Sequence, residues 1–142
     1  MGRRYARALS SGNTVTPSAL TAELRTTIGV SVILYFTVTN VSEESVELEF
    51  EGGQQYDFAV VERRTQRQVW HWGAKRMFGG VPRRRVLAPG EKITFLQPWP
   101  ATARGDYTAS AWLTSSSHKA AATVNVALRE LPGAWLKNRT AG

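Results

Sequence analysis

The chain has 142 residues, a formal net charge of +7 and no cysteine. A chain of this length forms one domain without help from a metal or a disulfide, and the lack of cysteine excludes a disulfide scaffold, a thiolate metal site and a cysteine nucleophile. No stretch approaches the roughly 18 apolar residues that cross a bilayer, and no apolar run follows the N-terminal arginines as in a secretory signal. We therefore expect a cytoplasmic protein without a membrane segment.

The first part of the chain predicts a mobile arm followed by strands. Residues 1–14 are small and polar and show no periodicity. A weak strand pattern covers 20–25 and a strong one covers 30–39. In the strong pattern one face carries Val30, Val32, Leu34, Phe36 and Val38. The opposite face is partly apolar as well, which is typical of a central strand.

The segment 40–51 gives the clearest indication of an antiparallel sheet. A turn at 40–45 leads into a strand at 46–50, where Val46, Leu48 and Phe50 alternate with glutamates. A slip by one residue would bury three carboxylates, and burial of unpaired charges is very costly. The face of this strand that meets the core is therefore determined by the sequence pattern.

The remaining segments complete an all-β pattern. Gly52 and Gly53 predict a turn that permits positive φ. Strands are predicted at 56–62, 68–72, 92–96, 105–113 and 122–128, with a long loop at 73–90. Seven or eight short strands at this spacing predict an immunoglobulin-like antiparallel β-sandwich over residues 15–129, followed by a mobile tail at 130–142.

Charge is unevenly distributed along the sequence. Five glutamates lie between Glu43 and Glu51, whereas eight lysines and arginines lie between Arg63 and Arg85 with no acid among them. This distribution predicts a bipolar molecule whose field could steer a charged partner. Ordinary solvated faces are the plainer interpretation of such runs.

Four segments stand in a fixed order along the chain. They are VTNVSEESVELEFEGGQQYDFAV, then VWHW followed by Phe78, then LAPGEKITFLQPW, then GDYTASAWLT. Their order and spacing resemble the intracellular proteinase inhibitor family known as the BsuPI domain, over roughly residues 30–126. The resemblance implies an immunoglobulin-like sandwich that binds an intracellular subtilisin-like serine proteinase, although domains of this kind also occur in proteins without an inhibitory role. Thr65 and Gln66 stand where the family pattern tends toward a glycine-bearing hairpin turn.

The residues give no pattern of enzyme chemistry. The histidines are His71 and His118, and the serines before His118 lack the glycine-flanked elbow of a nucleophile, so a polar turn is the favoured interpretation. Zinc spacing, a calcium loop and a phosphate-cradling glycine loop are also missing from the sequence. We therefore expect no catalytic residue, no metal and no cofactor.

Two aromatic side chains allow a different interpretation. Trp70 and Trp72 are two residues apart, so both would point to one face of a strand. Beside Arg83, Arg84 and Arg85 they could form a stacking platform for single-stranded nucleic acid or a glycan. Packing in the core is the interpretation that we favour for these rings.

The long loop is the best candidate for contact with a partner. The predicted partner-binding residues are Lys75, Arg76, Met77, Phe78, Arg83, Arg84 and Arg85. An extended loop can enter a proteinase cleft as an added strand, with Met77 or Phe78 in the apolar specificity pocket. Alternatively, Phe78 anchors the loop to the core while the arginines are solvated. Occlusion of the cleft by several loops also remains open.

Three functions follow, in order of preference. The first is a monomeric inhibitor of a cytoplasmic subtilisin-like serine proteinase, and this hypothesis depends mainly on the resemblance. The second is a non-inhibitory protein-interaction module that uses the basic loop. The third and least favoured is a nucleic-acid or glycan binder.

Overall fold

The computed structural model describes residues 18–133 and contains strands but no helix in that range. The strands are β1 (Leu20–Ile28), β2 (Val32–Asn40), β3 (Val46–Phe50), β4 (Tyr56–Glu62), β5 (Gln68–His71), β6 (Arg83–Leu87), β7 (Lys92–Trp99), β8 (Gly105–Leu113) and β9 (Ala121–Leu128). No helix within these residues is long and apolar enough to cross a membrane. The predicted arm at 1–14 and the tail beyond Gly133 lie outside the described residues.

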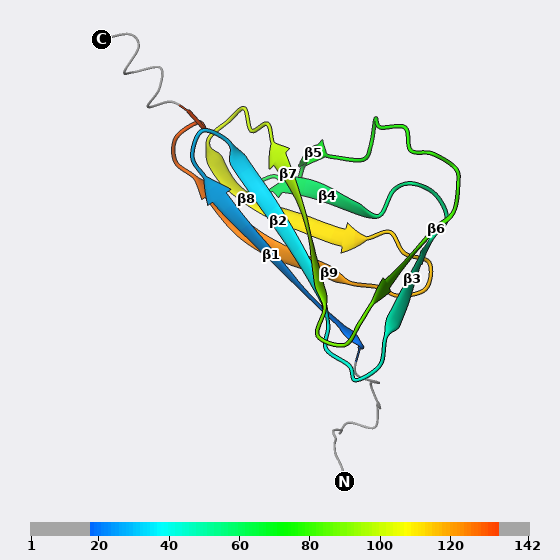
Figure 1. The fold of residues 1–142 in the computed structure, drawn as a ribbon. Coiled ribbons are helices and arrows are strands. Elements are labelled where there is room, and N and C mark those ends of the chain that lie inside the picture. Colours follow the sequence, from blue (N-terminus) through cyan, green and yellow to red (C-terminus); the bar gives the residue numbers. More distant parts are fainter. Residues whose placement is uncertain (1–17, 134–142) are drawn as a thin grey trace, which may run out of the picture.

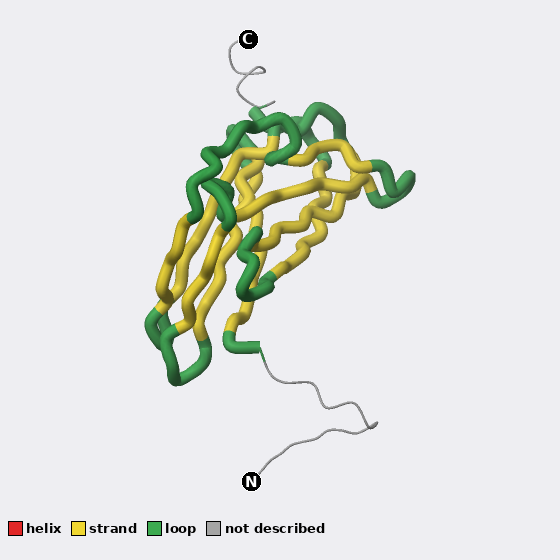
Figure 2. The backbone as a smooth tube through the Cα atoms, turned by 90° about the vertical axis from the view of Figure 1, so that its right-hand side faces the viewer, coloured by secondary structure: helices red, strands yellow, loops and turns green. Residues whose placement is uncertain are grey.

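The strands form two larger sheets and one small one (Figure 1). One sheet has the order β1-β2-β7, the other has the order β5-β4-β8-β9, and β3 pairs with β6. All pairings are antiparallel. Figure 2 shows the strands in layers, with most loops at their ends. The predicted all-β, immunoglobulin-like sandwich is confirmed, with nine strands in place of seven or eight.

The core lies between the two larger sheets. On β2 the side chains from Val32 to Val38 alternate between buried and half-buried, and on β8 those from Tyr107 to Leu113 do the same. Phe36 on β2 meets Phe58 on β4 edge to face, with ring centroids 6.5 Å apart. The predicted core face of 30–39 holds except at Val30, which precedes β2 and is 61% exposed.

The small sheet corrects two expectations. Arg83, Arg84 and Arg85 lie on β6 and not in a loop, and Arg84 is the register partner of Glu49 on β3. The Nε atom of Arg84 is 3.3 Å from an Oε atom of Glu47. The acidic strand and the last three arginines of the basic segment therefore lie side by side, which contradicts the predicted separation of charge for this part of the basic segment. Opposite charges on neighbouring strands stabilise their pairing.

The glycine pair after β3 has a different role from the predicted one. Neither Gly52 nor Gly53 is among the described residues with positive φ. The backbone N–H of Gly53 donates to the carbonyl oxygen of Gly79 at 2.7 Å, and a Cβ on Gly52 would lie 2.7 Å from the same oxygen. Glycine is required here because another segment of backbone approaches closely.

A tyrosine corner joins the two larger sheets at the start of β8. The buried hydroxyl of Tyr107 donates to the carbonyl oxygen of Ala103 at 2.6 Å, which is the arrangement typical of immunoglobulin-like sandwiches. Trp99 packs edge-on against the Tyr107 ring at 4.8 Å. Burial raises the pKa of Tyr107 above its ordinary value of 10.0, and the carboxylate of Glu62 raises it further.

The Tyr107 hydroxyl should make the protein less stable in alkali. Because its pKa is higher in the folded than in the unfolded state, stability is constant below about pH 10 and falls as pH rises through the folded pKa. Tyr107→Phe should cost about 1 kcal/mol at pH 8 through the lost hydrogen bond, and should lose less stability between pH 8 and pH 11 than the parent. Urea unfolding at both pH values tests this prediction. The control is Tyr35→Phe, because Tyr35 is only half-buried. An equal alkaline loss in the parent and Tyr107→Phe would contradict it.

The β4–β5 hairpin contains a strained residue that glycine should relieve. Gln66 has a φ of 62°, a left-handed conformation that disfavours residues with a Cβ. Gln66→Gly should raise the free energy of unfolding by about 0.5 kcal/mol and the melting temperature by about 2 °C. Gln66→Ala is the matched control, because it loses the bond from the Gln66 amide to the Arg63 carbonyl and keeps the unfavourable φ. A glycine variant no more stable than the alanine variant would disprove the interpretation.

Candidate functional site

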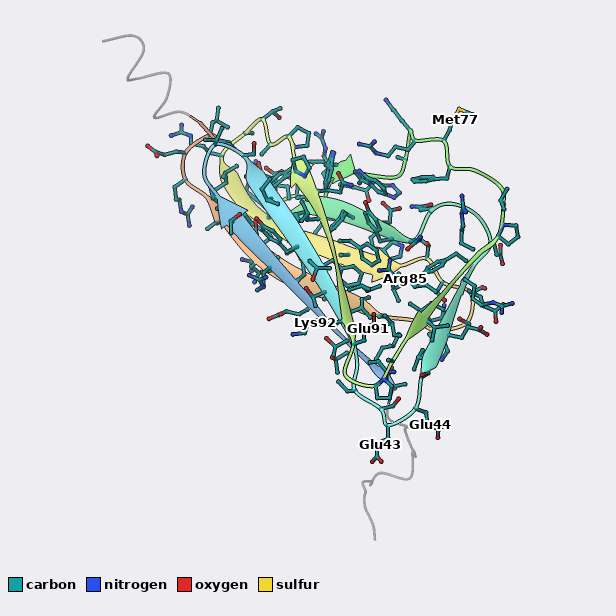
Figure 3. All side chains as sticks on the ribbon, in the orientation of Figure 1. Glu43, Glu44, Met77, Arg85, Glu91 and Lys92 are labelled. Carbon is teal, nitrogen blue, oxygen red and sulfur yellow. The ribbon has the colours of Figure 1, made fainter. Side chains whose placement is uncertain are left out.

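The β5–β6 loop, defined as residues 72–82, carries the central part of the predicted site. Its tip extends away from the sheets, and Met77 projects from it into solvent (Figure 3). Met77 is 99% exposed, although it is a large apolar side chain. Lys75 and Arg76, which precede it, are exposed as well.

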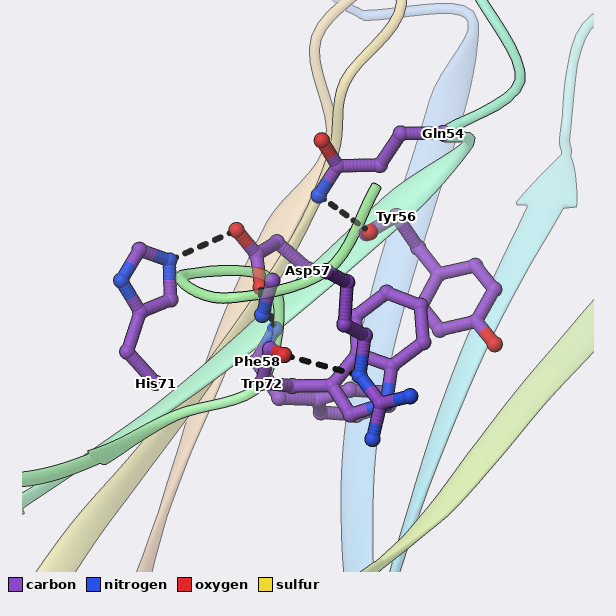
Figure 4. A network of polar contacts seen from close by, with 8 residues as sticks. Gln54, Tyr56, Asp57, Phe58, His71 and Trp72 are labelled. Carbon is purple, nitrogen blue, oxygen red and sulfur yellow. Dashed lines mark hydrogen bonds and ion pairs between the residues drawn. The ribbon is translucent and has the colours of Figure 1, made fainter. Parts of the chain in front are cut away.

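The start of the loop is held by a buried carboxylate (Figure 4). Asp57 on β4 is buried, and one of its oxygens lies 2.7 Å from Nε2 of His71. The other oxygen accepts the backbone N–H of Gly73 at 2.9 Å and that of Phe58 at 2.8 Å. A Cβ on Gly73 would lie 2.8 Å from the carboxylate, so only glycine fits. We call Asp57, His71 and Gly73 the Asp57 clamp.

A series of aromatic rings in contact connects the loop to the core. Phe95 on β7 stacks on Tyr56 at 4.4 Å, Tyr56 stacks on Trp72 at 4.7 Å with 16° between the planes, and Trp72 meets Phe78 at 5.6 Å. We call these four residues the aromatic ladder. The guanidinium carbon of Arg76 lies 4.8 Å from the centroid of the Trp72 ring, and Nε of Arg76 donates to the Trp72 carbonyl at 2.9 Å.

The far end of the loop has a third attachment. The Gly79 carbonyl accepts the N–H of Gly53, which follows β3. The loop is therefore fixed at the Asp57 clamp, at the aromatic ladder and at Gly79. The segment Lys75–Met77 lies between these attachments and can be presented in a defined position without further ordering.

The structure separates the predicted site residues into two groups. Lys75, Arg76, Met77 and Phe78 lie in the β5–β6 loop, whereas the three arginines at 83–85 lie on β6. Phe78 is half-buried against the core, as in the alternative that assigns it an anchoring role. Met77 makes no such contact and remains the candidate for recognition.

The tryptophan pair does not form an exposed platform. Trp72 is buried in the aromatic ladder and Trp70 is half-buried against the core. Core packing, the favoured interpretation, is confirmed for Trp72.

The serine turn between β8 and β9 attaches to β3. Ser116 N–H donates to the Glu49 carbonyl at 2.8 Å, and Ser117 Oγ donates to the Glu47 carbonyl at 3.1 Å. These bonds satisfy backbone groups on the open edge of β3. The interpretation of this segment as a polar turn is thus supported, and its serines connect the small sheet to the sandwich.

The Asp57–His71 pair invites comparison with a catalytic dyad. A nucleophile would have to lie within hydrogen-bond distance of His71, and no serine or threonine hydroxyl within residues 18–133 hydrogen-bonds to it. In the same part of the chain no three His, Asp or Glu side chains are placed to hold a metal ion. The pair instead orients the loop.

Sequence reasoning missed Asp57, the residue that holds the clamp together. A signal was present, because Asp57 interrupts the apolar run YDFAVV of a predicted strand. A carboxylate in such a run must find partners when buried. The partners themselves, at His71 and Gly73, depend on the pairing of β4 with β5.

Removal of the clamp should release the start of the loop. Asp57→Ala leaves the N–H groups of Phe58 and Gly73 without their acceptor, which should cost about 3 kcal/mol of unfolding free energy. Limited proteolysis at Lys75 or Arg76 should also become faster, since cleavage requires local opening. Asp106→Ala is the control, because its exposed ion pair with Arg129 (3.3 Å) should contribute below about 1 kcal/mol. Equal urea midpoints and cleavage rates for both variants would contradict this role.

No curated protein matches the chain. Two solved structures, Bacteroides uniformis β-glucuronidase 2 covalently bound to cyclophellitol-6-carboxylate aziridine and a Bacteroides uniformis β-glucuronidase, superpose with TM-scores of 0.45 and 0.44, each at 12% identity. The superposition covers 79% of this chain and 15% of each enzyme chain, and at these values it carries no argument.

The family comparison covers most of the chain. Residues 19–118 match the family BsuPI, described as intracellular proteinase inhibitor. The matched region spans β1 to β8 and contains the Asp57 clamp, the aromatic ladder and the β5–β6 loop. Such membership implies a proteinase as partner and favours a non-enzymatic role. The chain therefore belongs to the BsuPI family of intracellular proteinase inhibitors.

Proposed function

We propose that the protein inhibits an intracellular subtilisin-like serine proteinase by inserting the tip of the β5–β6 loop into the active-site cleft. The family supports a proteinase as the target class. The observation that carries the proposal is Met77, 99% exposed on a loop with three attachments. The subtilisin-like type of the target and the cytoplasmic location belong to the proposal.

The fixed loop explains how binding could be tight. Ordering a flexible loop at an interface costs free energy, and a loop already held in place avoids most of that cost. Burial of an exposed methionine side chain in an apolar pocket contributes about 1.5–3 kcal/mol. Residues 72–75 form a turn, so pairing with the enzyme backbone as an added strand would have to use the segment from Met77 onward.

The same attachments would oppose turnover. A substrate loop leaves the cleft after cleavage because its new ends separate. Here the Asp57 clamp and the packing of Phe78 against Trp72 hold both sides of Met77, so the ends would remain in place. Arg76 and Lys75 add positive charge that would favour an acidic rim on the enzyme. A non-inhibitory interaction module would use the same loop without reducing proteinase activity.

The proposal assigns the main contact to one side chain. Met77→Asp should weaken inhibition of a subtilisin-type proteinase at least about 100-fold, because a carboxylate replaces the apolar group in the pocket. A 100-fold change corresponds to about 2.7 kcal/mol of binding free energy. Stability should not change, since Met77 is fully solvated. Titration of the enzyme with each purified variant measures this.

The control is Val41→Asp, which places the same charge on an exposed apolar residue (55%) in the turn after β2. This variant should inhibit as well as the parent. If the parent protein in large excess left proteinase activity unchanged, the proposed function would be rejected. If the parent inhibited and Met77→Asp inhibited equally, the target class would stand and the contact would have to be sought in other loops.

A further inference from the structure

A pocket of about 490 Å³ lies where β5, the end of β7 and the β1–β2 turn meet. Its walls include Val30, Trp70, Pro98, Trp99 and Leu131, and its polar groups include Arg76 and Gln97. None of the residues assigned to recognition at the loop tip, apart from Arg76, lines it. The volume falls within the range of small-molecule sites, which is about 300–1,000 Å³.

The walls of this pocket select for a flat apolar group. Two tryptophans are among the lining residues, Trp70 half-buried and Trp99 buried. Proline and aliphatic side chains supply much of the remaining surface. Aromatic rings bind well against such surfaces because they bury a large area and stack favourably on indole.

The charged groups of the pocket favour an anion as ligand. Arg76 is the single cation among the lining residues, and no acidic residue lines the pocket. Within residues 18–133 Arg76 forms no ion pair with a carboxylate. Its charge is thus available to an anion that enters the pocket.

Arg76 is also oriented in advance. Its Nε atom donates to the Trp72 carbonyl at 2.9 Å and its guanidinium lies over the Trp72 ring. These contacts restrict the guanidinium plane and leave the two terminal nitrogens for a carboxylate, which suits their fork geometry. Gln97 is fixed in the same way, because its amide donates to the Tyr56 hydroxyl at 2.7 Å.

We propose that this pocket binds a small aromatic carboxylate, with the ring against the Trp70 and Trp99 walls and the carboxylate on the Arg76 guanidinium. The inference does not depend on proteinase inhibition. Charge complementarity selects the anion, and the wall chemistry favours an aromatic ring.

Phenylacetate and its neutral analogue phenylacetamide are suitable probes. Titration calorimetry of the full chain should give saturable binding of phenylacetate and at least about tenfold weaker binding of the amide, since a charge-assisted hydrogen bond contributes about 1.5–3 kcal/mol. Arg76→Gln should weaken phenylacetate binding at least about tenfold. Arg64→Gln, which removes an exposed cation from the β4–β5 hairpin outside this pocket, should bind like the parent.

A second variant covers the case in which Arg76→Gln disturbs the loop. Leu131 lines the pocket and is 41% exposed, so Leu131→Glu should fold normally and abolish binding by placing a carboxylate at the site. Lack of saturable phenylacetate binding to the parent would overturn the proposal. Equal affinity for the acid and the amide, or unchanged affinity in both Arg76→Gln and Leu131→Glu, would overturn it as well.

Discussion

The stacking of Trp72 on Tyr56 is the contact on which the arrangement of the loop depends. Tyr56 is fixed from the opposite sheet by Phe95 and by the amide of Gln97. Trp72 rests on this support at 4.7 Å and in turn supports Phe78 and the guanidinium of Arg76. Its indole N–H is buried without a hydrogen-bond partner in residues 18–133. Ring stacking and burial therefore position Trp72, and side-chain hydrogen bonding does not.

Close backbone packing adds the attachments that stacking cannot provide. Gly73 approaches Asp57 so closely that any side chain would collide with the carboxylate. Gly52 and Gly53 meet Gly79 in the same way. Both contacts use glycine for its small volume, with no positive φ at any of these positions. The β5–β6 loop is thus held through close contacts at Gly73, near its start, and at the carbonyl group of Gly79, beyond its tip.

Alternation of apolar residues was sufficient to predict the main strands, since side chains such as Leu34 and Leu48 meet only one environment each. It failed at β6, where three consecutive arginines show no period of two. That strand exists because Glu47 and Glu49 lie opposite and because Leu87 is buried at its end. The Asp57 clamp was missed for a related reason. Its partners are distant in sequence and are brought together only by the pairing of β4 with β5.

Three consecutive residues show how the loop separates its supporting contacts from the side chain proposed for recognition. Arg76 turns back onto Trp72, Phe78 packs on the same ring from further along the chain, and Met77 between them points into solvent. Arg76 and Phe78 restrict the backbone of Met77, while the side chain of Met77 remains exposed to solvent. The side chain at position 77 can therefore change with the partner while the fold stays stable. Changes at positions 76 or 78 would instead alter the geometry in which position 77 is presented. The proposed contact with the proteinase and the contacts that hold the loop thereby fall on adjacent but different residues.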